Sequence, residues 1–247
     1  MKALFFGSIG TICDTSEIQR LAYNDSFKDA GLDWHWSVSF YRELLSITGG
    51  QNRLKHFIGL EQRKGLSASL LENVHRNKTT IFNERLMSGQ AILRPGVARL
   101  IDDAKHAGLR LGFISTTERR NIDAIAAALG TAFTLGDFDL VTDRTMIEHE
   151  KPAPDVYHVA LKLISCKPHL AVAIEDTADC LRSVLGADIA CVVTPNSFST
   201  EQDFVAAHAL VSHLGDPNTP ADQLAGRDIV QHGIVTLDTL ARLTQLD

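Results

Sequence analysis

Two neighbouring carboxylates, a lysine and a hydroxyl-rich turn are the residues of this chain whose types and positions could do chemistry. Glu175 and Asp176 end an apolar stretch, and carboxylate oxygens are ligands that Mg²⁺ prefers. Lys151 precedes a Pro-Ala-Pro-Asp string and could bind phosphate as a point charge. Ser115 follows a predicted strand, and Thr116 and Thr117 open a predicted helix, where unpaired backbone N–H groups can bind an anion. If the fold brings them together, residues of these types could hold an anion or a metal ion.

Each of these residues also has a simpler interpretation. Glu175 and Asp176 could do no more than cap the helix that follows them, and Lys151 could be a surface lysine. The hydroxyl-rich turn could be a plain helix cap made by Thr117. Tertiary structure must decide between these interpretations.

The N-terminal strand leads into a short loop whose side chains offer little chemistry. An apolar strand at residues 3–6 leads into residues 7–11, which read Gly-Ser-Ile-Gly-Thr. Gly7 has no side chain and Ile9 cannot transfer a proton, so neither offers a nucleophile or an acid–base group. Ser8 is an alternative nucleophile, but on a strand end it should point away from the side of its neighbours.

Helices and strands alternate in the predicted structure from residue 94 onward. Strands are predicted at residues 109–114, 170–174 and 189–193, and helices at 95–107, 122–129, 154–164 and 178–187. Pro95 is expected in the first turn of the first of these helices. Such alternation predicts an α/β fold with a Rossmann-like, doubly wound parallel sheet. Ligands of such sheets lie at the carboxyl ends of the strands, and Ser115, Lys151 and Glu175 fall at or near such ends.

The remaining segment, residues 16–88, has apolar residues at helical spacing, broken by glycines. Ser16 is predicted to cap its first helix, with Gln19 completing a capping box. We interpret residues 16–88 as a helical cap that is inserted into a core formed by residues 1–15 and 89–247.

Several strings of this sequence resemble one family. The apolar strand and the Gly-Thr of residues 7–11 are similar to the first loop of the haloacid dehalogenase (HAD) superfamily, which reads Asp-x-Asp-Gly-Thr. Longer strings resemble the CbbY-type group of that superfamily, whose known activity is xylulose-1,5-bisphosphate phosphatase. The matching strings are residues 31–36, 48–50, 93–97, 108–111, 150–157 and 174–177. The resemblance covers nearly the whole chain and implies the same core with a helical cap.

The resemblance also implies roles for individual residues. In the family the first loop aspartate attacks phosphorus, and the second protonates the leaving oxygen. Gly7 and Ile9 occupy those two positions here, so both catalytic aspartates of the family are absent. The implied substrate or phosphate contacts are Thr11, Ser115, Thr116, Lys151 and Arg53, and the implied metal ligands are Glu175 and Asp176. One charged ligand is missing, so we expect only weak Mg²⁺ binding; Glu175 or Asp176 could instead neutralise Lys151.

Two further departures concern the cap and the last motif. The group usually carries Gly-Gly-Lys-x-Arg in the cap, where residues 49–53 read Gly-Gly-Gln-Asn-Arg. Arg53 could hold a second phosphate or be a surface helix residue, and Gln51 in place of lysine puts bisphosphate recognition in doubt. Cys180 and Asp188 stand where the family has glycine, which suggests relaxed demands for close backbone approach.

Composition limits which partners the protein can be expected to bind and in which compartment it is expected to work. The chain has 247 residues, 45% apolar, with 24 Lys+Arg against 30 Asp+Glu and a net charge of −6. Scattered basic residues argue against nucleic acid, and short apolar runs argue against a membrane span. Four cysteines stand far apart without a Cys-x-x-Cys pair, which argues against a zinc site or a disulfide framework and predicts a cytoplasmic protein.

The sequence therefore predicts a HAD-like protein that resembles a sugar-phosphate phosphatase but lacks the aspartyl-phosphate mechanism. The favoured hypothesis is a binding protein for a small phosphorylated sugar or other anion. The alternatives are an enzyme with changed acid–base chemistry, a weak metal-dependent phosphatase, and a partner-binding module.

Overall fold

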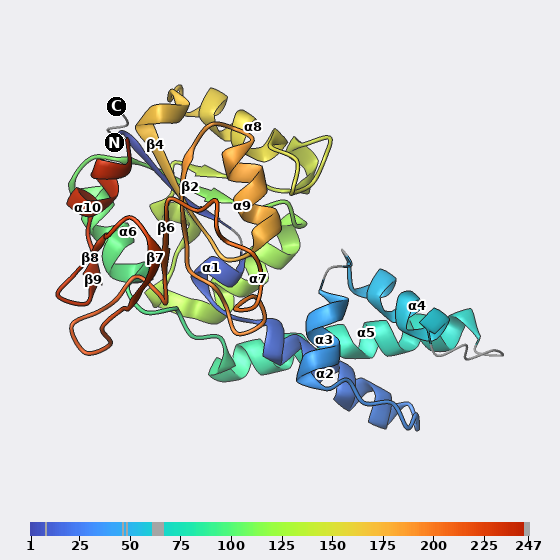
Figure 1. Cartoon of the computed structure of the whole chain (residues 1–247). Helices are drawn as coiled ribbons and strands as arrows, with labels where there is room; N and C mark the ends of the chain where they lie inside the picture. The colour runs from blue at the N-terminus through green and yellow to red at the C-terminus, as the bar shows by residue number, and fades with distance from the viewer. Residues whose placement is uncertain (8, 46, 48, 61–66, 245–247) are drawn as a thin grey trace. The chain divides into compact units, whose positions relative to one another are not determined.

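The structure is a computed structural model that describes residues 1–7, 9–45, 47, 49–60 and 67–244. Its contacts divide the chain into two compact units. The core unit comprises Met1–Asp14 and Ile92–Asp247, and the helical unit comprises Thr15–Ala91 (Figure 1). Each unit is described by itself.

The core unit is built on a seven-stranded sheet with the order β3-β2-β1-β4-β5-β6-β7. Its strands are β1 (Ala3–Gly7), β2 (Arg110–Ile114), β3 (Leu140–Val141), β4 (Ala171–Glu175), β5 (Ala190–Val193), β6 (Ala209–Val211) and β7 (Gln223–Gly226). All neighbouring pairs from β3 to β6 are parallel, and only β7 runs antiparallel, against β6. The predicted doubly wound α/β fold is confirmed.

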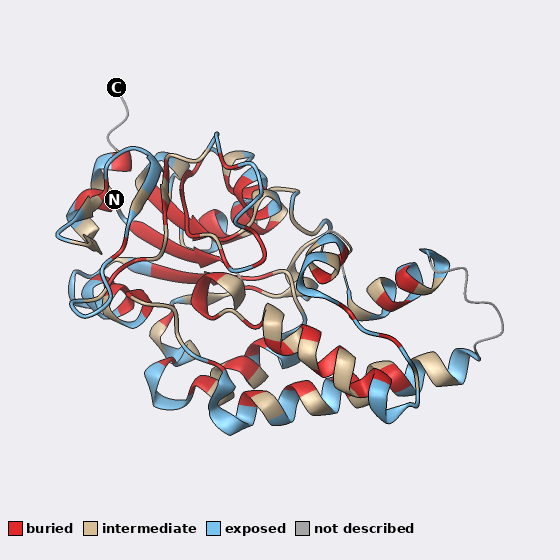
Figure 2. Ribbon diagram, turned by 60° about the horizontal axis from the view of Figure 1, so that its bottom comes forward, coloured by how far each residue is buried: buried red, intermediate tan, exposed pale blue. Residues whose placement is uncertain are grey.

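Both faces of the central strands are buried, as expected for a parallel sheet covered by helices. All five residues of β1 are buried. Phe5 belongs to the core cluster that also contains residues of α8 (Asp155–Leu163) and α9 (Ala178–Leu185). Phe6, its neighbour, faces the other way and lies edge-on to Phe138, with ring centroids 6.1 Å apart. Figure 2 shows the strands as a continuous buried layer.

The other helices of the core unit are α1 (Ile9–Ile12), α6 (Val97–His106), α7 (Arg119–Leu129) and α10 (Leu237–Ala241). The predicted start of α6 at Pro95 is wrong. Gly96 has φ 84° and forms the N-cap, so the helix begins at Val97 and Pro95 lies in the turn before it. A side chain on Gly96 would also collide with the backbone at Leu214, with carbon atoms 2.6 Å apart.

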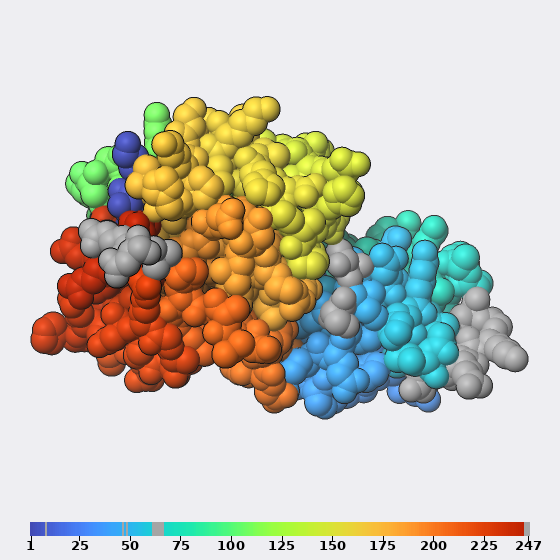
Figure 3. All heavy atoms as spheres, turned by 45° about the horizontal axis from the view of Figure 1, so that its top comes forward, coloured from blue at the N-terminus to red at the C-terminus, as the bar shows by residue number. Residues whose placement is uncertain are grey.

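The C-terminal third of the core unit adds short strands to the far edge of the sheet. A second, two-stranded sheet joins β8 (Val230–Gln231) to β9 (Ile234–Val235). Figure 3 shows these segments, in orange and red, forming one continuous surface with the α8–α9 region.

The helical unit contains α2 (Ser16–Asp29), α3 (Val38–Leu44), α4 (Gly50–Leu60) and α5 (Ala68–Arg85), with a π-helical turn at Leu86–Gln90. The predicted N-cap at Ser16 is wrong, because α2 already includes Ser16 and Thr15 is its N-cap without a side-chain hydrogen bond. Among the described residues of the whole chain, none of the helices is both long and apolar enough to cross a bilayer.

Aromatic side chains hold the helical unit together. Trp36 is fully buried and lies 4.3 Å from Tyr23 and 5.1 Å from Phe27, measured between ring centroids. Trp34 is 5% exposed and packs edge-on against Phe27 and Phe57. Tilted and edge-to-face pairs of this kind add about 0.5–1.5 kcal/mol each to the effect of burial.

Candidate functional site

Three neighbouring strands end at the candidate site. The register of β1 and β2 pairs Gly7 with Ile114, and β4 pairs Phe6 with Ile174, the residue before Glu175. Ser115 directly follows β2. The sheet therefore brings Gly7, Ser115 and Glu175 to one edge, although 168 positions separate the first from the last. This is where α/β sheets bind ligands.

The side chain of Glu175 fills the space that a side chain at residue 7 would need. An ideal Cβ on Gly7 would lie 1.9 Å from Glu175 Oε2 and 2.0 Å from its Cδ. No aspartate could stand at residue 7 while Glu175 keeps this conformation. The absent side chain of β1 is thus replaced by a carboxylate that enters from β4.

Glu175 is held there by an ion pair and by hydroxyl groups. Lys151 Nζ lies 2.5 Å from Glu175 Oε1, and the Tyr157 hydroxyl donates to the same oxygen. Thr11 Oγ1 approaches Oε2 at 3.5 Å, and Lys151 also donates to the carbonyl of Ile114 at 3.1 Å. The lysine side chain is 6% exposed and the glutamate 0%. The two charges therefore neutralise each other away from water.

The surroundings of Lys151 favour its charged form. Burial alone would lower the pKa of Lys151, but the nearby Cys180 and the carboxylate and hydrogen bond of Glu175 outweigh burial and raise it. Burial, reinforced by the charge of Glu175, raises the pKa of Tyr157, so its hydroxyl stays protonated and donates. Lys151 is a buried ion-pair partner, which excludes its interpretation as a surface lysine.

Asp176 has one satisfied and one unsatisfied oxygen. Asn196 Nδ2 donates to Oδ2 at 2.7 Å, whereas Oδ1 is buried without a hydrogen-bond partner in the described part of the chain. An ideal Cβ on Gly10 would come within 1.9 Å of Oδ2, so this approach requires glycine. Burial, and then the charge of Glu175, raise the pKa of Asp176 to about 6.

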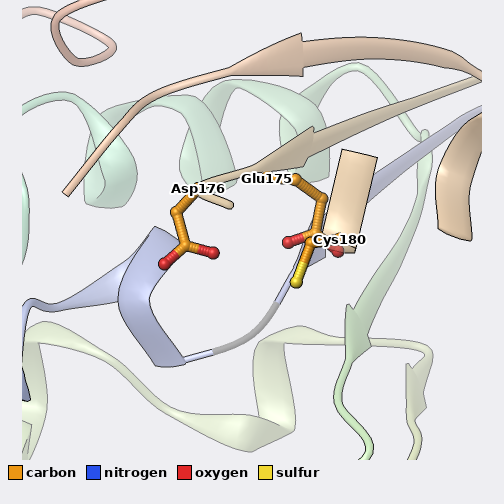
Figure 4. Close-up of side chains that lie close together, drawn as sticks. All are labelled: Glu175, Asp176 and Cys180. Atoms are coloured by element: carbon orange, nitrogen blue, oxygen red, sulfur yellow. The ribbon is translucent and has the colours of Figure 1, made fainter. Parts of the chain in front are cut away.

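A thiol completes a cluster of three potential metal ligands. Glu175, Asp176 and Cys180 each offer a donor atom, and these atoms lie within 4.8 Å of one another. All three residues are buried. In Figure 4 the side chains of Glu175 and Cys180 meet, and Asp176 turns one carboxylate oxygen toward them.

The hydroxyl-rich turn after β2 is ordered by local hydrogen bonds. Ser115 is fully buried, and its Oγ accepts from Thr117 N at 3.1 Å. Its backbone N–H donates to Thr142 Oγ1 at 2.9 Å. Thr116 is half-buried. The alternative of a helix cap by Thr117 is wrong, because α7 begins at Arg119 and Glu118 is its N-cap. The Ser115 hydroxyl hydrogen can still be donated to a bound anion.

Two residues with clear roles at the site were missed in the sequence. Tyr157 lies in the string 150–157, but nothing in that string indicates its role, because its hydrogen-bond partner Glu175 is 18 positions away.

The second missed residue, Arg94, lies in the string 93–97. Its guanidinium donates to the carbonyls of Gly10, Thr194, Pro195 and Ser212 at 2.7–3.2 Å. Arg94 thereby joins the first loop to the loop after β5. A single arginine before a proline does not indicate this role in the sequence.

Other predicted residues lie elsewhere or outside the described structure. Arg53 belongs to the helical unit, where its Nε donates to the carbonyls of Leu44 and Ile47 at 3.1 and 2.8 Å. These two bonds join Arg53 of α4 to the last residue of α3 and to Ile47. Ile9 is half-buried at the start of α1. Ser8, the alternative nucleophile, lies outside the described residues.

Comparisons with known proteins agree with this fold. A family model described as haloacid dehalogenase-like hydrolase matches residues 1–183. The chain is 39% identical to protein CbbY of Cupriavidus necator over 227 residues, which cover 90% of this chain and 89% of that protein.

Two crystal structures of CbbY from Rhodobacter sphaeroides are similar in fold. The complex with phosphate has a TM-score of 0.75 and 37% identity, and a mutant in complex with xylulose-1,5-bisphosphate has a TM-score of 0.75 and 36% identity. In both cases the match covers 86% of this chain and 94% of the other. The chain belongs to the haloacid dehalogenase-like hydrolase family.

Proposed function

We propose that this protein binds a small phosphorylated sugar, or a chemically related anion, without hydrolysing it through an aspartyl-phosphate. The site keeps buried donors for an anion but has no acceptor for a transferred phosphoryl group. Gly7 and Ile9 stand at the positions of the two catalytic aspartates. Losing a nucleophile can cost on the order of 10⁶ in rate.

The position of Glu175 is the observation that carries this proposal. Its carboxylate takes over the electrostatic role of the missing aspartate, because it keeps Lys151 charged inside the protein. A lysine ammonium has three N–H donors, and two are accounted for by Glu175 and the carbonyl of Ile114. The third can bind an anion, together with the hydroxyl of Ser115.

Glu175 is a poor substitute for the missing nucleophile. Its Oε1 accepts from both Lys151 and Tyr157. Two such bonds stabilise the carboxylate and reduce its tendency to attack phosphorus. Oε2 lies where the Cβ of residue 7 would be, closer to the strand than the carboxylate of an aspartate at residue 7 would lie.

The family's Mg²⁺ ion does not fit the donors that this chain presents. Magnesium requires a near-octahedral oxygen shell. Gly7 contributes no carboxylate, Glu175 Oε1 is committed to Lys151, and the sulfur of Cys180 stands beside Asp176. No step of the proposed function depends on this ion.

The helical unit is proposed to act as a cap, as predicted for residues 16–88, and the protein is proposed to work in the cytoplasm. Support for the first point comes from the CbbY structures, which match the chain over 86% of its length. Support for the second comes from the four cysteines, all of which are free, as in a reducing compartment.

The test combines a binding and a turnover measurement on the same protein. Titration calorimetry with xylulose-1,5-bisphosphate and a panel of sugar monophosphates should reveal binding, while phosphate release should stay far below the 1–10³ s⁻¹ typical of enzymes. Ser115→Ala should weaken binding by about 10- to 100-fold, the effect of one hydrogen bond to a charged group. Lys151→Met should weaken it at least as much.

Lys162→Met, which changes an exposed lysine of α8, is the matched control and should bind like wild type. Turnover at an enzymatic rate would refute the loss of hydrolysis. Absence of binding to every sugar phosphate would refute the binding role and leave the partner-binding module ahead.

A further inference from the structure

The cluster of Glu175, Asp176 and Cys180 has a composition that the sequence pattern did not reveal. Two of the donors are adjacent at the end of β4, and the third lies in the first turn of α9. Thr177 caps this helix by accepting from Cys180 N at 3.3 Å, which fixes the start of the helix that carries Cys180. The three side chains meet as a result (Figure 4).

An independent observation indicates that one donor atom of this cluster lacks a binding partner among the described residues. Asp176 is 4% exposed, yet its Oδ1 has no hydrogen-bond partner within the described residues. Buried polar atoms are nearly always paired, so an orphaned carboxylate oxygen needs an explanation such as a bound ion. Glu175 Oε2 can also accept a further ligand, since the bond that it accepts from Thr11 Oγ1 is long, at 3.5 Å.

The chemistry of the donors selects among cations. Thiolate ligands favour Zn²⁺ and other thiophilic ions, whereas Mg²⁺ takes oxygen ligands only. Zinc accepts sulfur and carboxylate oxygen in a four-coordinate shell, and three protein ligands leave one position open. We propose that Glu175, Asp176 and Cys180 form a binding site for a thiophilic divalent cation of the Zn²⁺ class, in place of the Mg²⁺ site of the family.

Binding such an ion requires the three donor atoms to move closer together. Donor atoms of a tetrahedral zinc shell lie about 3.5 Å apart, given Zn–O and Zn–S distances of about 2.1 and 2.3 Å. The observed donors lie within 4.8 Å of one another, so their separations must shorten by up to about 1.3 Å. Glycine at residue 7 is required, because a side chain there would displace Glu175 from the cluster.

The charges of the loaded site balance. Two carboxylates and one thiolate carry three negative charges, which the metal ion and the Lys151 ammonium compensate. Burial raises the pKa of the empty Cys180 thiol well above its usual value, so the ion must displace the thiol proton to solvent when the Zn–S bond forms.

The absence of a Cys-x-x-Cys pair, which argued against a zinc site, does not bear on a cluster that contains a single cysteine. Spacing rules describe sites in which two or more cysteines act together. In this cluster a single cysteine joins two carboxylates that belong to a different element of the fold. This proposal does not depend on binding of a sugar phosphate.

The test uses metal ions alone on the full-length, chelator-treated protein. Calorimetric titration should give one Zn²⁺ per chain, bound at least tenfold more tightly than Mg²⁺. Co²⁺ should produce a thiolate-to-cobalt charge-transfer band in the near ultraviolet. Cys180→Ser should abolish the band and weaken Zn²⁺ binding by on the order of 100-fold. Cys166→Ser, which changes a half-buried thiol in the turn before β4, should leave both unchanged.

Asp176→Asn provides a second variant if Cys180→Ser does not fold, and it should also weaken Zn²⁺ binding. The proposal is overturned if Zn²⁺ does not bind, if neither variant affects Zn²⁺ binding, or if Mg²⁺ binds as tightly as Zn²⁺. None of these outcomes changes the expected binding of sugar phosphates, so the two proposals fail separately.

Discussion

Gly7→Ala should destabilise the core unit far more than a methyl group in a strand normally would. The new Cβ would lie 1.9 Å from Glu175 Oε2 and 2.5 Å from Oε1, so the carboxylate must leave its place. Lys151, 6% exposed, would then lose its ion-pair partner. Breaking a buried ion pair costs about 3–5 kcal/mol, and this is the expected loss in free energy of unfolding.

A double-mutant cycle isolates this cause. In a Glu175→Ala background there is no carboxylate for the new methyl group to displace. Gly7→Ala should then be within about 1 kcal/mol of neutral, because alanine in place of an extended glycine also lowers the entropy of the unfolded chain. The coupling energy between the two positions should therefore be about 3 kcal/mol, which is large for a pair of residues.

The assay is urea unfolding followed by far-ultraviolet circular dichroism. Gly136→Ala is the matched control in the core unit, because its Cβ would meet Thr134 Oγ1 at 3.5 Å, an ordinary contact. It should change stability by less than about 1 kcal/mol. An equal cost of Gly7→Ala in both backgrounds would show that Glu175 does not occupy the space above residue 7.

Three further results are expected. Arg94→Met should cost about 3 kcal/mol or more in free energy of unfolding, because four backbone carbonyls lose a buried donor; a loss below 1 kcal/mol would contradict this bridging role. Burial, and then Arg53, lower the pKa of Lys78 to about 7 in the folded helical unit. The folded state therefore binds fewer protons than the unfolded state between pH 7 and 10.5, and stability should rise with pH there by about 1.4 kcal/mol per unit. Lys78→Met should remove that slope, measured by tryptophan fluorescence because both tryptophans belong to the helical unit; the same slope in wild type and variant would refute it. Thr236→Ala should cost about 1 kcal/mol, because Thr236 closes the capping box of α10; an unchanged urea midpoint would contradict the cap.

Local sequence patterns predicted most elements of the core because their signals are themselves local. The strand before Ser115 and the strand that ends at Glu175 lie within one residue of their predicted starts and ends. Helix starts were less predictable. Ser16 and Pro95 carry residue types typical of helix N-termini, but the chain geometry at Thr15 and Gly96 sets the true starts.

The sequence by itself determined that residues 7 and 9 carry no reacting group, since side-chain chemistry depends on residue type alone. It also determined the α/β fold, because hydrophobic spacing and turn residues act over short distances. Only the tertiary structure decided what replaces the missing aspartate. Parallel strands far apart in the chain place Glu175 over Gly7 and against Lys151. Such contacts arise from sheet order and from the direction of long side chains, and no spacing along the chain encodes either of them.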